Sequence, residues 1–302
     1  MCEYRLHESV FGREVSFVRY EAMPDVRGHI QENTSPLPSA GLGAAAPLAG
    51  FEGNPDFVLS LARGLQVIEA FEGSTDGLSV ADISRRTGLS RAAVRRLLIT
   101  LELLGYAGSD GRFYRLKTRV MRLGFSYLSS NSLATLAQPI LAHVIELVHE
   151  SSSVGVLEDD HIVYVARASA KRVMSVGLSV GSRLPAFCTS MGRVLLSGLS
   201  DQDLSAYLDR IELTAVTPRT IVDKALLFDV IRQVRVEGFA LNDEELELGH
   251  RSIAVPVRTR QGTMVAGMNI GLHAARVTVA EMIHRLLPIL REHAQMLGQL
   301  LG

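Results

Sequence analysis

Apolar residues recur near helical spacing in three successive segments that begin at residue 56. In the first segment, 57–71, the repeat runs through four apolar side chains (Phe57, Leu61, Leu65 and Ile68). This spacing places them on one face of an amphipathic helix. Two further segments with helical periodicity follow, at 79–88 and 90–106. The pattern therefore predicts three consecutive helices.

The residues between these segments predict where the second and third helices begin and end. Ser79 and Ser90 are typical N-cap residues, and Gly88 is a typical C-terminal stop. Only a Thr-Gly-Leu-Ser turn separates the two helices, and Leu89 within it can point inward to fix the angle between them. After the third helix, two short runs about a Ser-Asp-Gly turn predict a β-hairpin. Three helices and a hairpin predict a winged helix-turn-helix, with the helix-turn-helix at 78–98.

Strands and helices alternate in the second half of the chain. Two strands about an acidic turn come first, then a third strand, a short helix and a longer amphipathic helix. A strand meander and a C-terminal helix close the chain. These segments lie at 152–169, 172–185, 188–199, 223–238, 239–273 and 278–301. The order predicts an antiparallel sheet flanked by helices, and so the fold class is α+β.

The first 53 residues lack the pattern of a packed domain. They include a run rich in Pro, Gly, Ala and Ser, which predicts a flexible extension, and Met23 offers an alternative start. We therefore expect four parts: the extension, a winged helix-turn-helix domain, a helix that leads out of it and a second, α+β domain. Their predicted bounds are 1–54, 55–117, 118–132 and 133–302.

Charge is distributed unevenly along the 302 residues. The formal net charge is −1, yet the segment 78–122 holds ten basic and three acidic residues, a local net charge of +7. This asymmetry favours a polyanionic partner for that segment alone. The two cysteines form no ligand spacing or disulfide framework, and no apolar run is long enough to span a bilayer. We expect a cytoplasmic protein without membrane attachment or cofactor, associated with the nucleoid when it binds DNA.

The third predicted helix has the composition of a DNA recognition helix. If Val94, Leu97, Leu98 and Leu101 face the core, its arginines face outward, and arginine bonds guanine or clamps phosphate with its planar fork. The alternative is an ordinary solvated basic face, but the helix-turn-helix spacing and the basic hairpin favour DNA. We assign base reading to Arg91 and Arg95, phosphate contact to Arg96, and positioning to Arg85 and Arg86 on the preceding helix. The residues expected to meet DNA are Ser90, Arg91, Ala92, Arg95, Arg96, Arg112 and Tyr114.

The chain resembles the IclR family of bacterial transcription regulators from about residue 56 to its end. In the first half the resemblance rests on "FVLSLARGLQVIEAF", "LSVADISRRTGLSRAAVRRLLITLELLGY" and "GRFYRLKTRVMRLGFSYLSS". In the second half it rests on "RVMSVGLSVGSRLPAFCTSMGRVLLSGL", "GFALNDEELELGHRSIAVPVR" and "MNIGLH". It is closer to the branch that governs degradation of protocatechuate, 4-hydroxybenzoate and β-ketoadipate.

The resemblance implies a linker helix between the winged helix-turn-helix and a GAF-like effector-binding domain. It also implies operator DNA as one partner and a small carboxylic acid, aromatic or β-ketoadipate, as the effector. Family members form dimers or tetramers, joined chiefly through the N-terminal region, which would cover the apolar Leu123, Tyr127 and Leu128 of the linker. An activator of this kind would also contact RNA polymerase.

The resemblance further implies a set of effector-binding positions. The polar ones fall on Ser190, Asn242, Ser252 and Asn269, and the apolar ones on Val173, Val176, Leu184 and Met191. Hydroxyls and amides around an apolar floor suit a small polar organic ligand, and the helix that begins near Thr189 offers backbone N–H groups to a carboxylate. At Asn242 many relatives carry aspartate, so the ligands of those relatives do not transfer directly.

A bound carboxylate calls for a cation. We expect Arg183 to supply it because it precedes the pocket segment, and we expect Arg193 to point outward from its helix. His250 and Arg251 flank Ser252 and are further candidates, each with a solvated position as the alternative. Phe187 is expected either to stack on an aromatic ring or to fill the core, and Cys188 to be a buried apolar residue.

Two other classes of protein compete with a regulator. An enzyme would use Cys188, Thr189 or Ser190 as nucleophile and His250 or His273 as base, but no G-x-S-x-G elbow is present. A metalloregulator would need clustered ligands, and the nine histidines form no H-x-H or C-x-x-C group. The sequence therefore predicts a ligand-responsive regulator that is not an enzyme.

Overall fold

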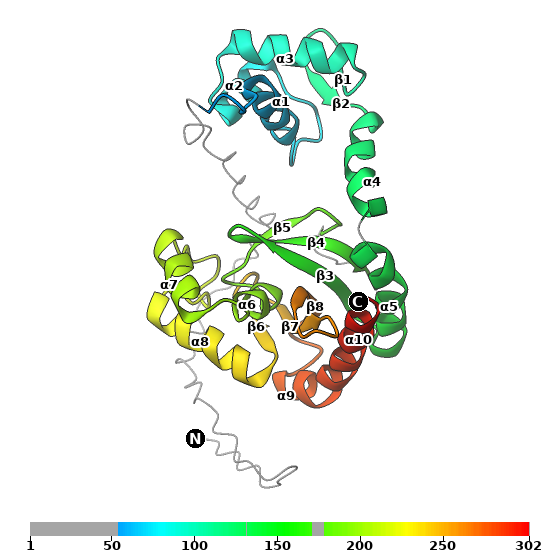
Figure 1. The fold of residues 1–302 in the computed structure, drawn as a ribbon, viewed down its shortest axis with the longest axis vertical. Coiled ribbons are helices and arrows are strands. Elements are labelled where there is room, and N and C mark those ends of the chain that lie inside the picture. Colours follow the sequence, from blue (N-terminus) through cyan, green and yellow to red (C-terminus); the bar gives the residue numbers. More distant parts are fainter. Residues whose placement is uncertain (1–53, 131, 171–177, 302) are drawn as a thin grey trace. The chain divides into compact units, whose positions relative to one another are not determined.

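The computed structural model describes residues 54–130, 132–170 and 178–301. The predicted N-terminal extension lies outside these residues. Figure 1 shows a small, mostly helical domain followed by a larger one built on a sheet. The α+β fold class is confirmed.

The N-terminal domain begins with three helices, α1 (Leu59–Glu69), α2 (Val80–Thr87) and α3 (Arg91–Leu103). Ser79 caps α2 through a capping box with Asp82, and Ser90 caps α3 by accepting from the Ala93 amide. Gly88 ends α2 in the left-handed conformation, with φ of 71°. Because L side chains are strained at this φ, the predicted role of glycine in the reversal between α2 and α3 is confirmed.

Only Ile68 of the described apolar stripe Leu61, Leu65 and Ile68 on α1 packs against the domain core. Val67, Ala70 and Phe71 contact the domain core, whereas Leu61 is 62% exposed and Leu65 47% exposed. Both stripes are apolar and lie side by side on the helix, so apolar spacing cannot tell which of them packs within the chain. Leu61 and Leu65 therefore form an exposed apolar stripe on the predicted amphipathic helix.

The predicted hairpin consists of β1 (Ala107–Ser109) and β2 (Tyr114–Leu116), which pair antiparallel. Leu78 extends it by a bridge to Tyr114. The Asp110 carboxylate accepts from the Phe113 and Arg112 amides at 2.8 and 3.0 Å. The Phe113 amide, the Arg115 side chain and the Arg112 amide together lower its pKa to about 2. Hydrogen bonds between the Asp110 side chain and neighbouring backbone amides thus hold the tip of the hairpin, which is the wing of the fold.

Two helices follow the wing, α4 (Met121–Ser130) and α5 (Ser132–Val148), with a short 3-10 turn at Thr118–Val120 before them. The predicted linker helix corresponds to α4. Met121, Leu123, Phe125 and Tyr127 on α4 are all exposed.

The C-terminal domain contains a six-stranded antiparallel sheet in the order β5-β4-β3-β8-β7-β6. The two strands predicted about an acidic turn are β3 (Ser151–Glu158) and β4 (His161–Ala168), and the meander is β6 (Ala240–Asp243), β7 (His250–Arg258) and β8 (Met264–His273). Of the predicted third strand, β5 (Arg183–Pro185) is described, and residues 171–177 lie outside the described residues.

Helices cover both faces of this sheet (Figure 1). On one face lie α5 and α10 (Leu287–Leu300), the latter preceded by α9 (Val279–Glu281) and a π-helical turn at Met282–Leu286. On the other lie α6 (Ser190–Leu196), α7 (Asp201–Arg210) and α8 (Lys224–Glu237). Alternate residues of β7 serve the two faces: Ile253, Val255 and Val257 join the first core, and Ala254 joins the second. The predicted effector residues Ser190, Met191 and Ser252 belong to the second face.

Candidate functional site

The turn between α2 and α3 fixes the recognition helix within its domain. The Ser84 hydroxyl donates to the Leu89 carbonyl at 2.6 Å, and the Leu89 side chain packs against the domain core. Leu89 therefore points inward, as the sequence indicated.

Helix α3 buries one face and exposes its basic face. Val94, Leu98 and Leu101 are buried, and Leu97 packs partly against the same core. The predicted DNA-facing residues of α3 are all exposed: Arg91, Ala92, Arg95 and Arg96. Among the described residues, none of these three guanidinium groups forms an ion pair, so each is available to a phosphate or a base edge.

The arginines of α2 are used within the domain. Arg85 pairs with Asp82, and Arg86 donates to the backbone carbonyls of Ala70 and Glu72 at 2.8 and 3.0 Å. The carbonyls at the end of α1 are thereby tied to α2. The assignment of Arg85 and Arg86 to a helix that positions α3 on DNA stays a prediction.

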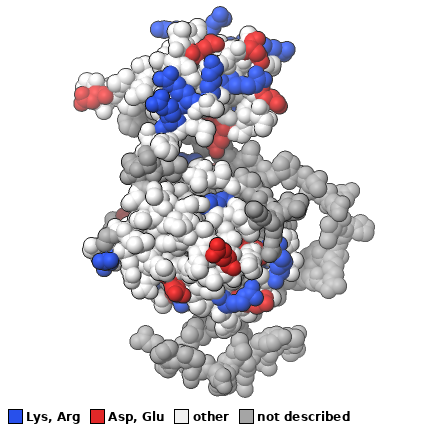
Figure 2. All heavy atoms as spheres, turned by 90° about the vertical axis from the view of Figure 1, so that its right-hand side faces the viewer, with Lys and Arg blue, Asp and Glu red and all other residues white. Residues whose placement is uncertain are grey.

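The two arginines of the β1–β2 hairpin, the wing, differ in their contacts within the domain. Arg112 is exposed and lies over the Phe113 ring at 5.1 Å. Arg115 is tied down by the Asp110 carboxylate at 2.9 Å and the Asp76 carbonyl at 2.8 Å. Tyr114 is half-buried against the core, so its contact with phosphate stays a prediction. Figure 2 shows Lys and Arg side chains gathered on the visible face of this domain.

In the C-terminal domain, the structure brings three of the predicted polar effector residues together. The Ser190 and Ser252 hydroxyls lie 2.8 Å apart, and both residues are buried. Asn242 is opposite Ser252 in the β6–β7 register. Ser190 sits at the start of α6, whose N-cap Thr189 accepts from the Gly192 amide at 3.1 Å. Helix α6 therefore lies against the strands that carry the other polar residues.

Asn242 is occupied by backbone partners. Its amide donates to the Cys188 carbonyl, and its side-chain oxygen accepts from the Glu245 amide at 3.4 Å. Asparagine at this position thus joins the segment before α6 to the loop after β6, a bond that aspartate could not donate.

Asn269 has a free side chain. It pairs with Ser153 on β3 and Ala254 on β7, and its amide makes no hydrogen bond with the described residues. Leu184 and Met191 are apolar parts of the second core, and Met191 rests over Gly155 and Gly267. The remaining predicted residues, Val173 and Val176, lie outside the described residues.

The two arginines that we considered first do not serve as a free cation. Arg183 forms an ion pair with Glu158, and it projects to the opposite face of β5 from Leu184. Arg193 does not point outward: it is 1% exposed and pairs with Glu245 through two bonds of 2.6 and 2.5 Å. Arg251 pairs with Asp243. The carboxylates that pair with these arginines lie on other strands or loops, so the sequence near each arginine does not reveal them.

Sequence reasoning missed Arg167 on β4. It lies opposite Ser153, and its Nη1 donates to the Ser153 hydroxyl at 3.0 Å. Its Nε is buried without a hydrogen-bond partner among the described residues, and burial lowers the pKa of the guanidinium. The available signal was a single arginine near the end of the apolar strand 161–168.

The geometry around the proposed nucleophiles bears on the enzyme alternative. Burial raises the pKa of the Cys188 thiol to about 12, and Ser190 is hydrogen-bonded to Ser252. Burial also lowers the pKa of His250 to about 4, helped by the nearby charges of Arg167 and His273. No hydrogen bond within the described part of the chain joins Cys188, Thr189 or Ser190 to a histidine. A nucleophile with an activating base is therefore not assembled there.

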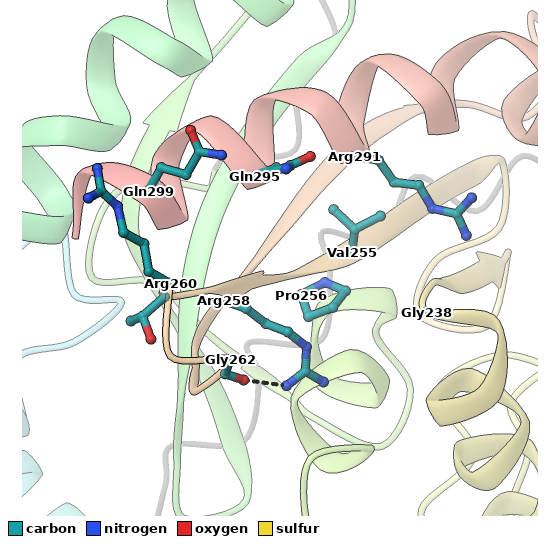
Figure 3. Close-up of a pocket in the computed structure, with 10 residues that line it drawn as sticks. Gly238, Val255, Pro256, Arg258, Arg260, Gly262, Arg291, Gln295 and Gln299 are labelled. Carbon is teal, nitrogen blue, oxygen red and sulfur yellow. Dashed lines mark hydrogen bonds between the residues drawn. The ribbon is translucent and has the colours of Figure 1, made fainter. Parts of the chain in front are cut away.

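A surface cavity of about 570 Å³ lies elsewhere, between α10 and the β7–β8 hairpin (Figure 3). Arg260 and Arg291 lie at opposite ends of its lining, and Arg258 turns to the Gly262 carbonyl, to which it donates at 3.0 Å. These guanidinium groups do not converge on one point, and none of the predicted effector residues lines the cavity.

The described ranges lack both a membrane-spanning helix and a cluster of metal ligands. No helix there is long and apolar enough to cross a membrane. No group of three His, Cys, Asp or Glu side chains there is placed to hold a metal ion.

Two family models match the chain. Residues 60–111 match the IclR helix-turn-helix domain, and residues 125–299 match the C-terminal domain of bacterial IclR transcriptional regulators. Each match falls on one of the two domains described above.

Individual relatives match over most of the chain. The Pca regulon regulatory protein of Pseudomonas putida is 51% identical over 82% of this chain and 85% of its own length. A crystal structure of a putative transcriptional regulator from Rhodococcus sp. RHA1 is 46% identical, with a TM-score of 0.72, over 80% of this chain and 98% of that one. The inducer-binding domain of an Acinetobacter PobR double mutant, in complex with 3-hydroxybenzoic acid, is 34% identical with a TM-score of 0.54. It covers 56% of this chain and 99% of its own.

Proposed function

This chain belongs to the IclR family of DNA-binding transcription regulators, and from that premise we propose that a small carboxylic acid of aromatic catabolism controls its operator binding. Protocatechuate, 4-hydroxybenzoate and β-ketoadipate are the first acids to consider. The names of the Pseudomonas and Acinetobacter relatives, and the hydroxybenzoic acid bound to one of them, support this choice. The observation that carries the proposal is the polar face against α6, on which Arg167 keeps a buried Nε without a hydrogen-bond partner among the described residues.

The proposal divides the chain at the bounds that the sequence suggested. Residues 55–117 bind the operator, 118–132 link, and 133–302 bind the acid. Arg91 and Arg95 read bases, while Arg96, Arg112, Ser90 and Tyr114 contact the backbone and Ala92 permits close approach. Exposure of the α3 face supports this division of labour.

The regulator acts as a homodimer or a homotetramer. Two uncovered apolar surfaces in the N-terminal part support this, one on α1 (Leu61 and Leu65) and one on α4 (Met121 and Phe125). Two recognition helices must reach half-sites on matching turns of DNA, so a change in their spacing alters affinity. As an activator, the dimer would also contact RNA polymerase.

The test measures operator binding with and without acid. Fluorescence anisotropy follows a labelled duplex from the region upstream of the chain's own gene, with each of the three acids at increasing concentration. We expect at least one acid to change the dissociation constant for this duplex by fivefold or more, in line with ordinary allosteric coupling. An unchanged constant with all three acids, although calorimetry detects their binding, would contradict control of operator binding.

The same titrations bear on enzyme activity. Acid recovered unchanged after long incubation supports a binding function, and conversion of the acid would favour the enzyme alternative. Sedimentation velocity of the unaltered chain and of a Leu61→Glu, Phe125→Glu variant measures assembly. The variant should sediment as a monomer.

A further inference from the structure

Arg167 differs from the other described arginines of residues 132–301. Eight of them form ion pairs with a carboxylate. These are Arg183, Arg193, Arg210, Arg219, Arg232, Arg235, Arg251 and Arg276. The remaining ones, Arg258, Arg260, Arg285 and Arg291, are exposed to solvent. Arg167 alone in this described part is half-buried and has no carboxylate partner.

Resting on the proposed function, we propose that Arg167 is the residue that binds the carboxylate of the effector. Ser153 and Asn269 stand beside it as neutral hydrogen-bonding groups. The ligand class is a small organic acid with one carboxylate at Arg167 and a second polar atom, hydroxyl or keto, toward Asn269 and the Ser190–Ser252 pair.

The register of the sheet places these groups in a row. Arg167 on β4 is opposite Ser153 on β3, and Ser153 is opposite Asn269 on β8. Residues that pair across an antiparallel sheet share a face, so all three side chains project to the side that α6 covers. Two strand spacings separate the backbones of Arg167 and Asn269, about 10 Å. That length accommodates one substituted benzene ring or a six-carbon keto acid.

The guanidinium is held in place but not saturated. Nη1 donates to the Ser153 hydroxyl at 3.0 Å, and the group lies over the Tyr164 ring with 6.0 Å between the guanidinium carbon and the ring centroid. Nε is buried and has no hydrogen-bond partner among the described residues. A half-buried charge without a carboxylate partner is costly, and a carboxylate that accepts from the remaining N–H groups of Nη1 and Nη2 offsets that cost.

Calorimetry can separate recognition of the carboxylate charge from recognition of the rest of the ligand. Calorimetry compares the tightest-binding acid among protocatechuate, 4-hydroxybenzoate and β-ketoadipate with its carboxamide, which keeps the shape but lacks the charge. Full-length protein is used in three forms: unaltered, Arg167→Gln, and Arg183→Gln. The last is a matched control, because Arg183 lies on the neighbouring strand and already pairs with Glu158.

We expect the unaltered protein and Arg183→Gln to bind the acid more tightly than the amide. Arg167→Gln should lose roughly 10- to 100-fold in acid affinity, the range of one charge-assisted contact, while its amide affinity changes little. Retention of the full acid preference in Arg167→Gln would overturn the role of Arg167 and leave the proposed function standing. Failure of the unaltered protein to bind any of the acids would overturn both.

A second variant keeps the test decisive if Arg167→Gln does not fold. Arg167→Lys preserves a positive charge but not two parallel N–H donors. Its affinity for the acid should lie below that of the unaltered protein, with the affinity for the amide unchanged. Equal acid affinity in Arg167→Lys and the unaltered chain would count against a bidentate contact at this residue.

Discussion

Arg193 and Glu245 form a buried ion pair that joins α6 to the loop after β6. Two parallel bonds of 2.6 and 2.5 Å connect the guanidinium and the carboxylate, and the side chains are 1% and 8% exposed. Arg193 also donates to the Phe187 carbonyl at 3.0 Å, and Glu245 accepts from the Ile221 amide at 3.3 Å. Ser190, one helical turn before Arg193, therefore depends on this pair for its position.

Breaking this ion pair should destabilise the C-terminal domain. Arg193→Met alone leaves a buried carboxylate without its partner, and the free energy of unfolding should fall by about 3–5 kcal/mol. Urea denaturation measures it. The double variant Arg193→Met, Glu245→Leu removes both charges and should recover much of the loss. A double variant as unstable as the single one would contradict this account.

Substitution of the exposed arginines of α3 should weaken DNA binding without harming the fold. Arg91→Ala and Arg95→Ala should each cost about 1–3 kcal/mol of operator binding if they read bases. Arg96→Ala should lower the salt dependence of binding instead, by about one unit of slope. Anisotropy titrations at several salt concentrations distinguish the two roles.

The control for these variants is Arg86→Ala on α2. Because Arg86 donates to two carbonyls at the end of α1, its removal should lower the melting temperature of the N-terminal domain. Arg91→Ala and Arg95→Ala should melt like the unaltered chain. Equal loss of stability in all three would mean that the α3 arginines support the fold.

Protonation of His250 should weaken the fold in acid. Its folded pKa of about 4 lies below the value of 6.5 expected in the unfolded chain, so its contribution to stability is complete above pH 6.5. That contribution is lost as the pH falls from 6.5 toward 4, up to about 3 kcal/mol. In His250→Asn this part of the loss should disappear, as measured by urea denaturation at pH 7, 6, 5 and 4. Parallel stability curves for the two proteins would contradict the prediction.

Gly192 should not tolerate a side chain. A Cβ at this position would lie 2.0 Å from the Ala186 carbonyl oxygen, so Gly192→Ala must displace α6 from its place on the sheet. We expect a loss of more than about 3 kcal/mol in unfolding free energy and loss of acid binding. Gly64→Ala on α1, where a Cβ meets nothing within 4 Å, is the matched control and should be neutral or slightly stabilising. Circular dichroism melts and calorimetry measure both effects.

The local pattern of the sequence predicted the winged helix-turn-helix well. Ser79, Gly88 and Ser90 act within one or two turns of themselves, so their capping roles follow from residue type and spacing. The exposed face of α3 followed from the positions of Val94 and Leu98. The choice between the two apolar stripes of α1 depended on packing with α3, which spacing does not encode.

Prediction of the effector site was less complete because its contacts connect distant segments. Ser190 and Ser252 are 62 positions apart in sequence, and Arg193 and Glu245 are 52 apart. Family resemblance supplied Ser190, Asn242 and Ser252, whereas no local signal paired Arg193 with Glu245. Arg167 was not predicted, because its distinguishing property is partial burial without a carboxylate partner among the described residues. Only the folded chain reveals this property.

The two faces of strand β7 are under separate constraints, because alternate residues pack against different helices. Its odd-numbered residues from Ile253 to Val257 pack on the core beneath α5 and α10, and its even-numbered residues His250, Ser252 and Ala254 face α6. Under the proposed function, substitutions at even positions would change the face that binds the acid, while the odd positions keep the domain folded. A descendant of this chain could thus bind a different ligand without a change of fold. A shift of one residue in the register of β7 would instead exchange its two faces and disrupt both the core and the ligand-binding side.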